Sequence, residues 1–155
     1  MLYRLYTPED FAALYAIEET CFQPPFRFSR GYIRQLVSGS DAATWIAHED
    51  GRMAGFAIVE WEQEADGTIA YIQTLEVAPE KRGAGVGGEL LRRVDGSARK
   101  AGAEEIWLHV DAENAAAIRL YERHRYQFNG KEENYYARGR AALVYSKPLA
   151  VGPVG

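Results

Sequence analysis

The hydrophobic and polar positions of the N-terminal part predict a strand followed by two helices. Residues 2–6 alternate large side chains, as a short strand does. Thr7-Pro8 then offers a helix N-cap and a proline at the first helical position. Apolar residues at helical spacing follow from Phe11 and end before Pro24-Pro25, where a helix cannot continue. A second short helix is expected from about Ser29.

The pattern changes to β in the next segment. Strands are predicted at 44–49, 52–62 and 68–77, joined by the turn dipeptides Asp50-Gly51 and Asp66-Gly67. Such short turns join neighbouring antiparallel strands, so the three strands are expected to form a meander.

The C-terminal half alternates helix and strand. A helix at 85–100, closed by Gly102, precedes a strand at 105–110, which predicts a right-handed β-α-β unit with the strand before it. The remaining predicted elements are a helix at 114–124 and strands at 126–136 and 141–147. The expected fold class is therefore α/β (α+β), with a mixed, mostly antiparallel sheet of about seven strands and four helices.

Length and composition predict one globular domain. The 155 residues fit a single domain, expected at 1–150 with a frayed tail at 151–155, and 47% hydrophobic residues are enough for a core. The formal net charge of −4 argues against a general nucleic-acid-binding protein. Residues 119–147, however, hold seven basic and three acidic side chains, a local excess that suits a phosphorylated small molecule.

Cys21 is the one cysteine, so no disulfide can form within the chain and a reducing compartment is expected. It ends the apolar stripe of a predicted helix with no basic motif near it in sequence, which predicts a buried, inert thiol. The sequence has neither a secretory signal nor an apolar run long enough to cross a membrane. We expect a cytoplasmic monomer or weak homodimer with no membrane partner, no nucleic-acid partner and no metal site.

A glycine-rich turn connects the strand ending at Val77 to the central helix. Residues 78–88 read Ala-Pro-Glu-Lys-Arg-Gly-Ala-Gly-Val-Gly-Gly. Glycines let backbone N–H groups approach an anion, and a helix N-terminus adds partial positive charge, so the turn predicts a phosphate cradle. A P-loop is excluded because Glu89 follows Gly88 where lysine is needed. A dinucleotide site is disfavoured because residues 79–82 separate the strand from the first glycine. The third class of ligand that such a turn could hold is coenzyme A.

The turn and a later segment resemble the acetyl-CoA-binding region of the GNAT (Gcn5-related) N-acetyltransferases. The residues that carry this resemblance are Val77-x-Pro79, Arg82-x-x-Gly85-x-Gly87, Leu90-Leu91, Leu108-His109-Val110, Asn114, Ala117 and Leu120-Tyr121-Glu122. Within the superfamily, the chain is most similar to RimI-like and NatE-type Nα-acetyltransferases, on the segments 25–28, 71–75, 108–110 and 133–136. The resemblance implies the GNAT fold, with an acetyl-CoA site at the central β-α-β unit.

The resemblance also implies which residues bind acetyl-CoA. They come from the strand end, the glycine turn and the last helix: Leu75, Val77, Arg82, Gly83, Ala84, Gly85, Val86, Gly87, Gly88, Asn114 and Tyr121. In the family, the turn holds the phosphates and the backbone N–H at the position of Val77 points at the acyl oxygen. The Arg82 side chain is expected to add charge-assisted hydrogen bonds.

Acyl transfer to an amine needs a group that takes the amine proton and an acid for the departing thiolate. The resemblance gives His109 the role of base with Tyr71 as its partner, because NatE-type enzymes carry this pair. Imidazole suits the role since it accepts a proton near neutral pH. Glu76 is the alternative base, and Tyr121 lies where the family has its thiolate proton donor.

Aromatic residues in two segments resemble the loops that hold a peptide N-terminus in the Nα-acetyltransferases. The candidates for acceptor binding are Phe26, Phe28, Tyr71, Tyr135 and Tyr136. The implied function is transfer of acetyl from acetyl-CoA to the α-amino group of a protein N-terminus by single displacement.

Two alternatives stay open. In the first, the acceptor is a small-molecule amine such as a polyamine or aminoglycoside; these polycations call for an acidic pocket, and no acids cluster in the predicted acceptor loops. In the second, the chain is a non-catalytic acyl-CoA-binding module.

The chain also departs from the family at Arg125-Tyr126, where Gly-Phe is usual, so it lacks the glycine that most easily ends a helix.

Overall fold

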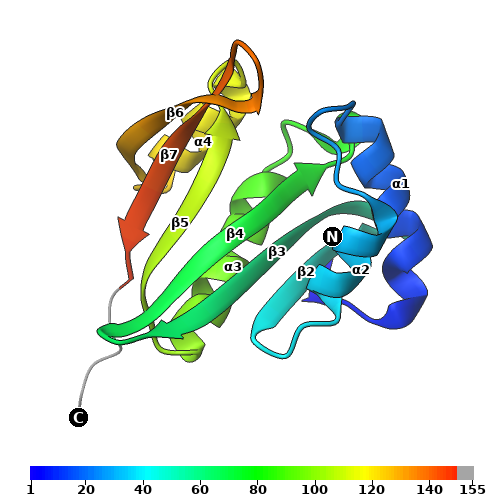
Figure 1. Ribbon diagram of the computed structural model, residues 1–155. Helices are drawn as coiled ribbons and strands as arrows, with labels where there is room; N and C mark the ends of the chain where they lie inside the picture. Colours follow the sequence, from blue (N-terminus) through cyan, green and yellow to red (C-terminus); the bar gives the residue numbers. More distant parts are fainter. Residues whose placement is uncertain (150–155) are drawn as a thin grey trace.

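A computed structural model describes residues 1–149, which form a seven-stranded sheet flanked by helices (Figure 1). The strands are β1 (Leu2–Leu5), β2 (Ala42–Glu49), β3 (Arg52–Glu64), β4 (Gly67–Val77), β5 (Ala103–Asp111), β6 (Gln127–Ala137) and β7 (Arg140–Pro148). The helices are α1 (Phe11–Cys21), α2 (Arg30–Val37), α3 (Val86–Lys100) and α4 (Ala115–Arg123), with short 3-10 helices at Pro8–Asp10 and Pro79–Lys81. The expected fold class is confirmed.

The sheet has the order β1-β2-β3-β4-β5-β7-β6, and β4 and β5 are its one parallel pair among the described residues. Helices α1 and α2 cover one face, where they pack on Phe56 and Ile58 of β3. Helix α3 covers the other face and packs on Ala57 and Val59 of the same strand. Strand alternation therefore divides the buried apolar side chains of β3 between two separate layers.

The parallel pairing between β4 and β5 is short. It runs from Thr68 opposite Ala103 to Tyr71 opposite Trp107, and β5 continues to Asp111 paired with β7 alone. A register shift between β3 and β4 leaves Gln73 as an extra residue in β4. Beyond Tyr71 the two strands diverge, and the sheet opens into a wedge-shaped gap beside the N-terminus of α3 (Figure 1).

Several boundaries differ from the predicted ones. Thr7-Pro8 starts a 3-10 turn before α1, because the Asp10 carboxylate accepts hydrogen bonds from the Thr7 amide and, at 2.7 Å, from Arg4. The Arg4 guanidinium lowers the pKa of Asp10 to about 2. Strand β3 extends to Glu64, past its predicted end at Glu62, because β4 already begins at Gly67. The tail predicted at 151–155 lies outside the described residues. Among residues 1–149, no helix is long and apolar enough to span a membrane.

Candidate active site

The glycine-rich turn forms one wall of a cavity at the N-terminus of α3, here called the α3 cavity, with a volume of ≈ 540 Å³. Gly83 and Gly85 have φ values of 83° and 82°, a left-handed backbone that glycine adopts without strain. Gly85 is the N-cap of α3, so the helix begins one residue after the predicted start. The first N–H groups of α3 have no carbonyl partner within the helix and are available to an anion in the cavity.

Gly87 and Gly88 serve a different purpose, which is close packing against α4. A Cβ atom at Gly87 would lie 3.1 Å from a methyl carbon of Leu120, and one at Gly88 would lie 3.0 Å from the imidazole of His124. The four glycines of the turn therefore divide into two pairs. The first pair is needed for backbone conformation, and the second lets α4 approach the cavity.

Most of the residues predicted to bind the cofactor line the α3 cavity. They are Leu75, Val77, Arg82, Gly83, Gly85, Val86, Gly87, Gly88 and Asn114. Ala84 and Tyr121 are not among the lining residues. Lys81 lines it as well, and Arg119 and Arg123 of α4 bring the expected basic segment to its wall. The cavity thus combines unpaired helix amides with several cations, which fits a phosphorylated ligand such as CoA.

Arg82 and Cys21 meet at the edge of this cavity. The Arg82 guanidinium donates to the Val77 carbonyl at 3.1 Å and lies 3.5 Å from the Cys21 sulfur. Cys21, predicted to be buried with no basic motif nearby, is only partly buried and contacts a guanidinium, because the glycine turn folds back onto the end of α1. Burial raises the pKa of the Cys21 thiol, which keeps it protonated and weakly nucleophilic.

Tyr121 and Asn114 belong to α4. Asn114 caps the helix by accepting a hydrogen bond from the Ala117 amide at 3.1 Å. Tyr121 is 6% exposed, and burial raises the pKa of its phenol, so it carries its proton at neutral pH. Its hydroxyl makes no hydrogen bond to another side chain or backbone group within residues 1–149. A protonated phenol without a protein partner is able to donate to a ligand.

Tyr71 and His109 lie at the point where β4 and β5 separate. The Tyr71 hydroxyl is 2.6 Å from Nδ1 of His109. Burial raises the pKa of Tyr71, so the phenol keeps its proton and is the donor in this bond. Nε2 of His109 then carries the ring proton and donates to the Glu132 carboxylate of β6 at 3.1 Å. Sequence reasoning missed Glu132, because only the β6–β7 hairpin brings it to β5.

Three of the predicted acceptor aromatics gather around this pair. Tyr135 stacks on the His109 ring with centroids 4.3 Å apart and planes 7° apart. Tyr136 packs against both Tyr135 at 4.9 Å and Phe26 at 4.8 Å. Phe28 lies apart from them and contacts Tyr32 of α2. The loop between α1 and α2 and the β6–β7 hairpin thus meet beside His109.

Glu76 is positioned differently from the other candidate base. Its side chain is 2% exposed, accepts from the Thr74 hydroxyl at 2.7 Å and lies close to the buried carboxyl of Glu18 of α1. Burial and the neighbouring Glu18 raise the pKa of Glu76 to about 10. Glu18 in turn accepts from the Phe28 amide at 3.0 Å, so the two carboxyl groups connect β4 to the acceptor loop.

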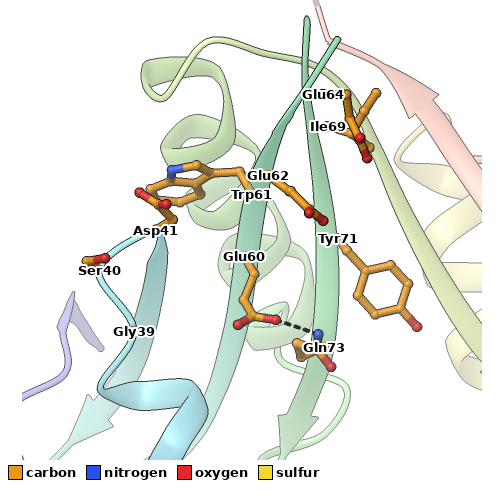
Figure 2. Close-up of a pocket in the computed structure, with 10 residues that line it drawn as sticks. All are labelled: Gly39, Ser40, Asp41, Glu60, Trp61, Glu62, Glu64, Ile69, Tyr71 and Gln73. Carbon is orange, nitrogen blue, oxygen red and sulfur yellow. Dashed lines mark hydrogen bonds between the residues drawn. The ribbon is translucent and has the colours of Figure 1, made fainter. Parts of the chain in front are cut away.

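A second cavity, here called the β3 cavity, lies on the α1 and α2 side of the sheet and has a volume of ≈ 470 Å³ (Figure 2). Tyr71 forms part of its wall, so it adjoins the Tyr71–His109 pair. Its polar and charged lining residues include Asp41, Glu60, Glu62, Glu64 and Gln73. The acids absent from the predicted acceptor loops are therefore found along β3. Within residues 1–149, no group of three or more His, Cys, Asp or Glu side chains is arranged to hold a metal ion.

Comparison with known proteins gives related sequences over most of the chain. The sequence pattern of the acetyltransferase (GNAT) family matches residues 11–126. The streptothricin acetyltransferase of Streptomyces lavendulae is 38% identical over 117 residues, which are 70% of this chain and 59% of that protein. The ribosomal protein bS18-alanine N-acetyltransferase of Escherichia coli K12 is 32% identical over 106 residues, 66% of this chain and 69% of that enzyme. This chain spans less than two thirds of the streptothricin enzyme.

Solved structures agree with the sequence comparison. The crystal structure of the ribosomal-protein-S18-alanine N-acetyltransferase from Escherichia coli has a TM-score of 0.82 at 26% identity and covers 99% of this chain and 96% of that one. Arabidopsis thaliana NAA60 in complex with acetyl-CoA shares the fold, with a TM-score of 0.85 at 22% identity over 96% of this chain and 98% of that one. The resemblance to acetyl-CoA-dependent N-acetyltransferases is thereby confirmed, and the chain belongs to the acetyltransferase (GNAT) family.

Proposed function

We propose that this chain is an Nα-acetyltransferase, which moves acetyl from acetyl-CoA to the α-amino group of a peptide or protein by single displacement. The observation that carries the proposal is the Tyr71–His109 pair, which lies at the opening between β4 and β5 and beneath the aromatic residues of the acceptor loops. The Escherichia coli enzyme that resembles the chain in sequence and structure is named for acetylating a ribosomal protein, bS18, at alanine.

The side chains at this point form a proton relay. Tyr71 Oη accepts the proton that the acceptor amine loses, while the proton of Tyr71 passes to Nδ1 of His109. The imidazolium that results is stabilised by the Glu132 carboxylate at Nε2. Glu76 suits the role of base poorly, because a buried carboxyl with a raised pKa, held beside Glu18 of α1, is protonated at neutral pH.

The α3 cavity suits the acetyl donor. Acetyl-CoA supplies the activated acetyl group when it is bound. The α3 amides and Arg119 and Arg123 would hold its phosphates. Val77 ends β4 beyond the last parallel rung, where its N–H is free of β5. Tyr121 holds a proton at Oη for the departing sulfur.

An α-amine is favoured over lysine for a chemical reason. The α-amino group has an ordinary pKa of about 7.7 to 8.0, whereas that of lysine is about 10.4. A neutral amine is required for attack, so a base as weak as imidazole is sufficient only for the first. The aromatic ring stack over His109 also gives a rigid, partly polar surface for a peptide backbone.

The experiment is incubation with acetyl-CoA and a pool of short peptides that differ at their first two residues and carry an internal lysine. Mass spectrometry then locates the acetyl group. We expect acetyl on α-amines in the wild-type protein and its loss in the Tyr71→Phe/His109→Ala variant. Acetylation of the internal lysine alone, or full α-amine turnover in that variant, would sink the proposal.

A small-molecule amine is the second candidate, and one observation favours it. The β3 cavity beside Tyr71 is lined by four carboxylates, as a polycationic acceptor requires. The streptothricin acetyltransferase that is 38% identical acts on a small molecule by name. A polyamine included in the same incubation separates the two candidates.

A further inference from the structure

Two carboxyl groups lie buried next to each other where α1 packs on the end of β4. Glu18 of α1 is 0% exposed, and Glu76 of β4 is 2% exposed and lies close to it. Within residues 1–149 neither of them forms an ion pair, whereas the equally buried Asp95 is paired with Lys147 at 2.8 Å. Two negative charges without a counter-ion are not stable in such a place, so the pair must hold a proton.

The groups around the pair do not neutralise it. The ionisable side chains of the neighbouring elements are Cys21 of α1, Arg27 of the loop at 22–29, Arg82 of the glycine turn and Tyr121 of α4. Both guanidinium groups are bonded to backbone carbonyls, those of Phe22 and Val77. Phe56, the β3 partner of Glu76, is apolar. Burial raises the pKa of the thiol and of the phenol, which stay neutral, and it raises the pKa of Glu76 as well.

Each carboxyl group has one oxygen that is hydrogen-bonded and one that is free. Oε2 of Glu18 accepts from the Phe28 amide at 3.0 Å, and Oε2 of Glu76 accepts from the Thr74 hydroxyl at 2.7 Å. The Oε1 atom of each is buried and has no hydrogen-bond partner within residues 1–149. A buried oxygen without a partner is destabilising, and one proton between the two Oε1 atoms satisfies both of them.

Glu18 also holds the loop at 22–29, which connects α1 to α2. Its carboxyl accepts from the Phe28 amide, and the Tyr15 hydroxyl, also of α1, donates to the Phe28 carbonyl at 2.8 Å. Phe26 of the same loop packs on Tyr136 of β6 with ring centroids 4.8 Å apart. The position of the Glu18 side chain therefore affects where the loop meets the aromatic residues of the proposed acceptor site.

We propose that Glu76 is a positioning residue for acceptor binding: its Oε1 donates the shared proton to Oε1 of Glu18, and this hydrogen bond fixes the loop at 22–29 against β4. The inference rests on the proposed function, in which this loop belongs to the acceptor site. Glu76 acts through Glu18 and the loop and not on the reacting atoms. Glu76→Gln keeps the hydrogen bond, because its amide N–H donates as the protonated carboxyl does, whereas Glu76→Ala leaves Glu18 buried without a donor at Oε1.

The first test is amide hydrogen exchange followed by NMR at about pH 7, which needs no turnover. The Phe28 amide should exchange about tenfold faster in Glu76→Ala than in the wild type, and at the wild-type rate in Glu76→Gln. Glu19→Gln changes the exposed neighbour of Glu18 on α1 and is the control, which should leave the rate unchanged.

The second test is kinetics with acetyl-CoA and one peptide that has a free α-amine. At about pH 7.5 the peptide KM should be about tenfold higher in Glu76→Ala at unchanged kcat, and unchanged in Glu76→Gln and Glu19→Gln. The shared proton is lost as pH approaches 10, so the wild-type KM should rise about twofold between about pH 8.5 and 10, whereas Glu76→Gln has no such proton to lose. The acceptor amine is largely neutral throughout this range.

Three results would overturn the inference. The first is an exchange rate and a KM in Glu76→Ala that equal those of the wild type. The second is a Glu76→Gln variant as impaired as Glu76→Ala, because the carboxyl group and not the hydrogen bond would then be required. The third is an equal rise of KM with pH in Glu76→Gln. If the wild type acetylates no peptide, the proposed function falls, and exchange at Phe28 still decides whether Glu76 holds the loop.

Discussion

The two cavities that flank the opening between β4 and β5 are built in different ways. The α3 cavity is made largely of backbone: left-handed glycines, helix amides and two glycines that admit α4. The acceptor side is made of side chains: Tyr71, His109 and the carboxylates of β3, which come from three strands. A donor site built in this way would tolerate many sequences that keep its glycines, whereas each side chain of the proposed acceptor site would change what is bound.

The largest expected effect tests the acceptor side. Tyr71→Phe removes one oxygen atom and with it the first group of the relay, so kcat should fall about 100-fold or more while CoA affinity stays unchanged. His109→Ala should cost a similar factor, and the double variant little more, because the two residues act as one unit. Steady-state assays with one peptide measure kcat, and calorimetry measures CoA affinity. Additive losses would contradict a shared relay.

The donor side should respond to a backbone change instead. Gly85→Ala adds a Cβ that meets no atom within 4 Å, but a left-handed alanine costs about 1 to 2 kcal/mol. We expect CoA affinity to fall about tenfold with the peptide KM unchanged. Gly96→Ala in the body of α3 is the control, since its surroundings are equally open and its backbone is helical. It should stabilise the protein by about 1 kcal/mol and leave CoA binding as it was.

Glu76 lies between the two sides, and its protonation links stability to pH. The pKa of Glu76 is about 10 in the folded protein against an ordinary 4.5, so the folded state keeps a proton that the unfolded chain loses. Its contribution to stability is present below about pH 4.5 and is lost as pH rises towards 10. Melting temperatures between about pH 5 and 9 should therefore fall in the wild type and fall less in Glu76→Gln. Glu80→Gln, on the exposed turn before α3, should keep the wild-type slope.

The smallest expected effect is on stability, and it concerns Arg125, which has a left-handed backbone although it is not a glycine. Arg125 has a φ of 71°, the conformation for which the family uses glycine. Arg125→Gly should raise the free energy of unfolding by roughly 0.5 to 1 kcal/mol, as measured by urea titration. Arg119→Gly, in the exposed middle of α4, should lower it by about 1 kcal/mol. If the change to glycine raises the free energy of unfolding at Arg125 and lowers it at Arg119, the backbone φ value decides the outcome. A loss of stability in Arg125→Gly would count against this account.

The donor side was predictable from the sequence because it is local. The glycine turn, the helix after it and the strand before it are continuous in the chain, and nine of the predicted residues line the α3 cavity. The strand and helix pattern was also local, which is why the sheet and its four helices match expectation while single boundaries shift by one or two residues. Arg125 is the instructive case, since it adopts a left-handed backbone conformation that a residue with a Cβ atom disfavours.

The acceptor side was only partly predictable because it depends on register. His109, Tyr71 and the aromatic residues were found through resemblance, but nothing in the sequence near Glu60 indicates that it faces Tyr71. That relation requires knowing which residue of β3 pairs with which of β4, including the extra residue at Gln73. Glu132 depends in the same way on the β6–β7 hairpin. Contacts of this kind are set by strand pairing between distant segments, and one sequence does not contain them.

The last rung between β4 and β5 pairs Tyr71 with Trp107. From Tyr71 to Val77, a length of about 20 Å, β4 is paired with β3 but has no partner in β5. If β3 and β4 rotated together by about 5° about this rung, Val77 would move by about 2 Å, whereas the atoms beside the rung would hardly move. The geometry therefore allows the width of the opening beside α3 to change far more than the distance between Tyr71 and His109.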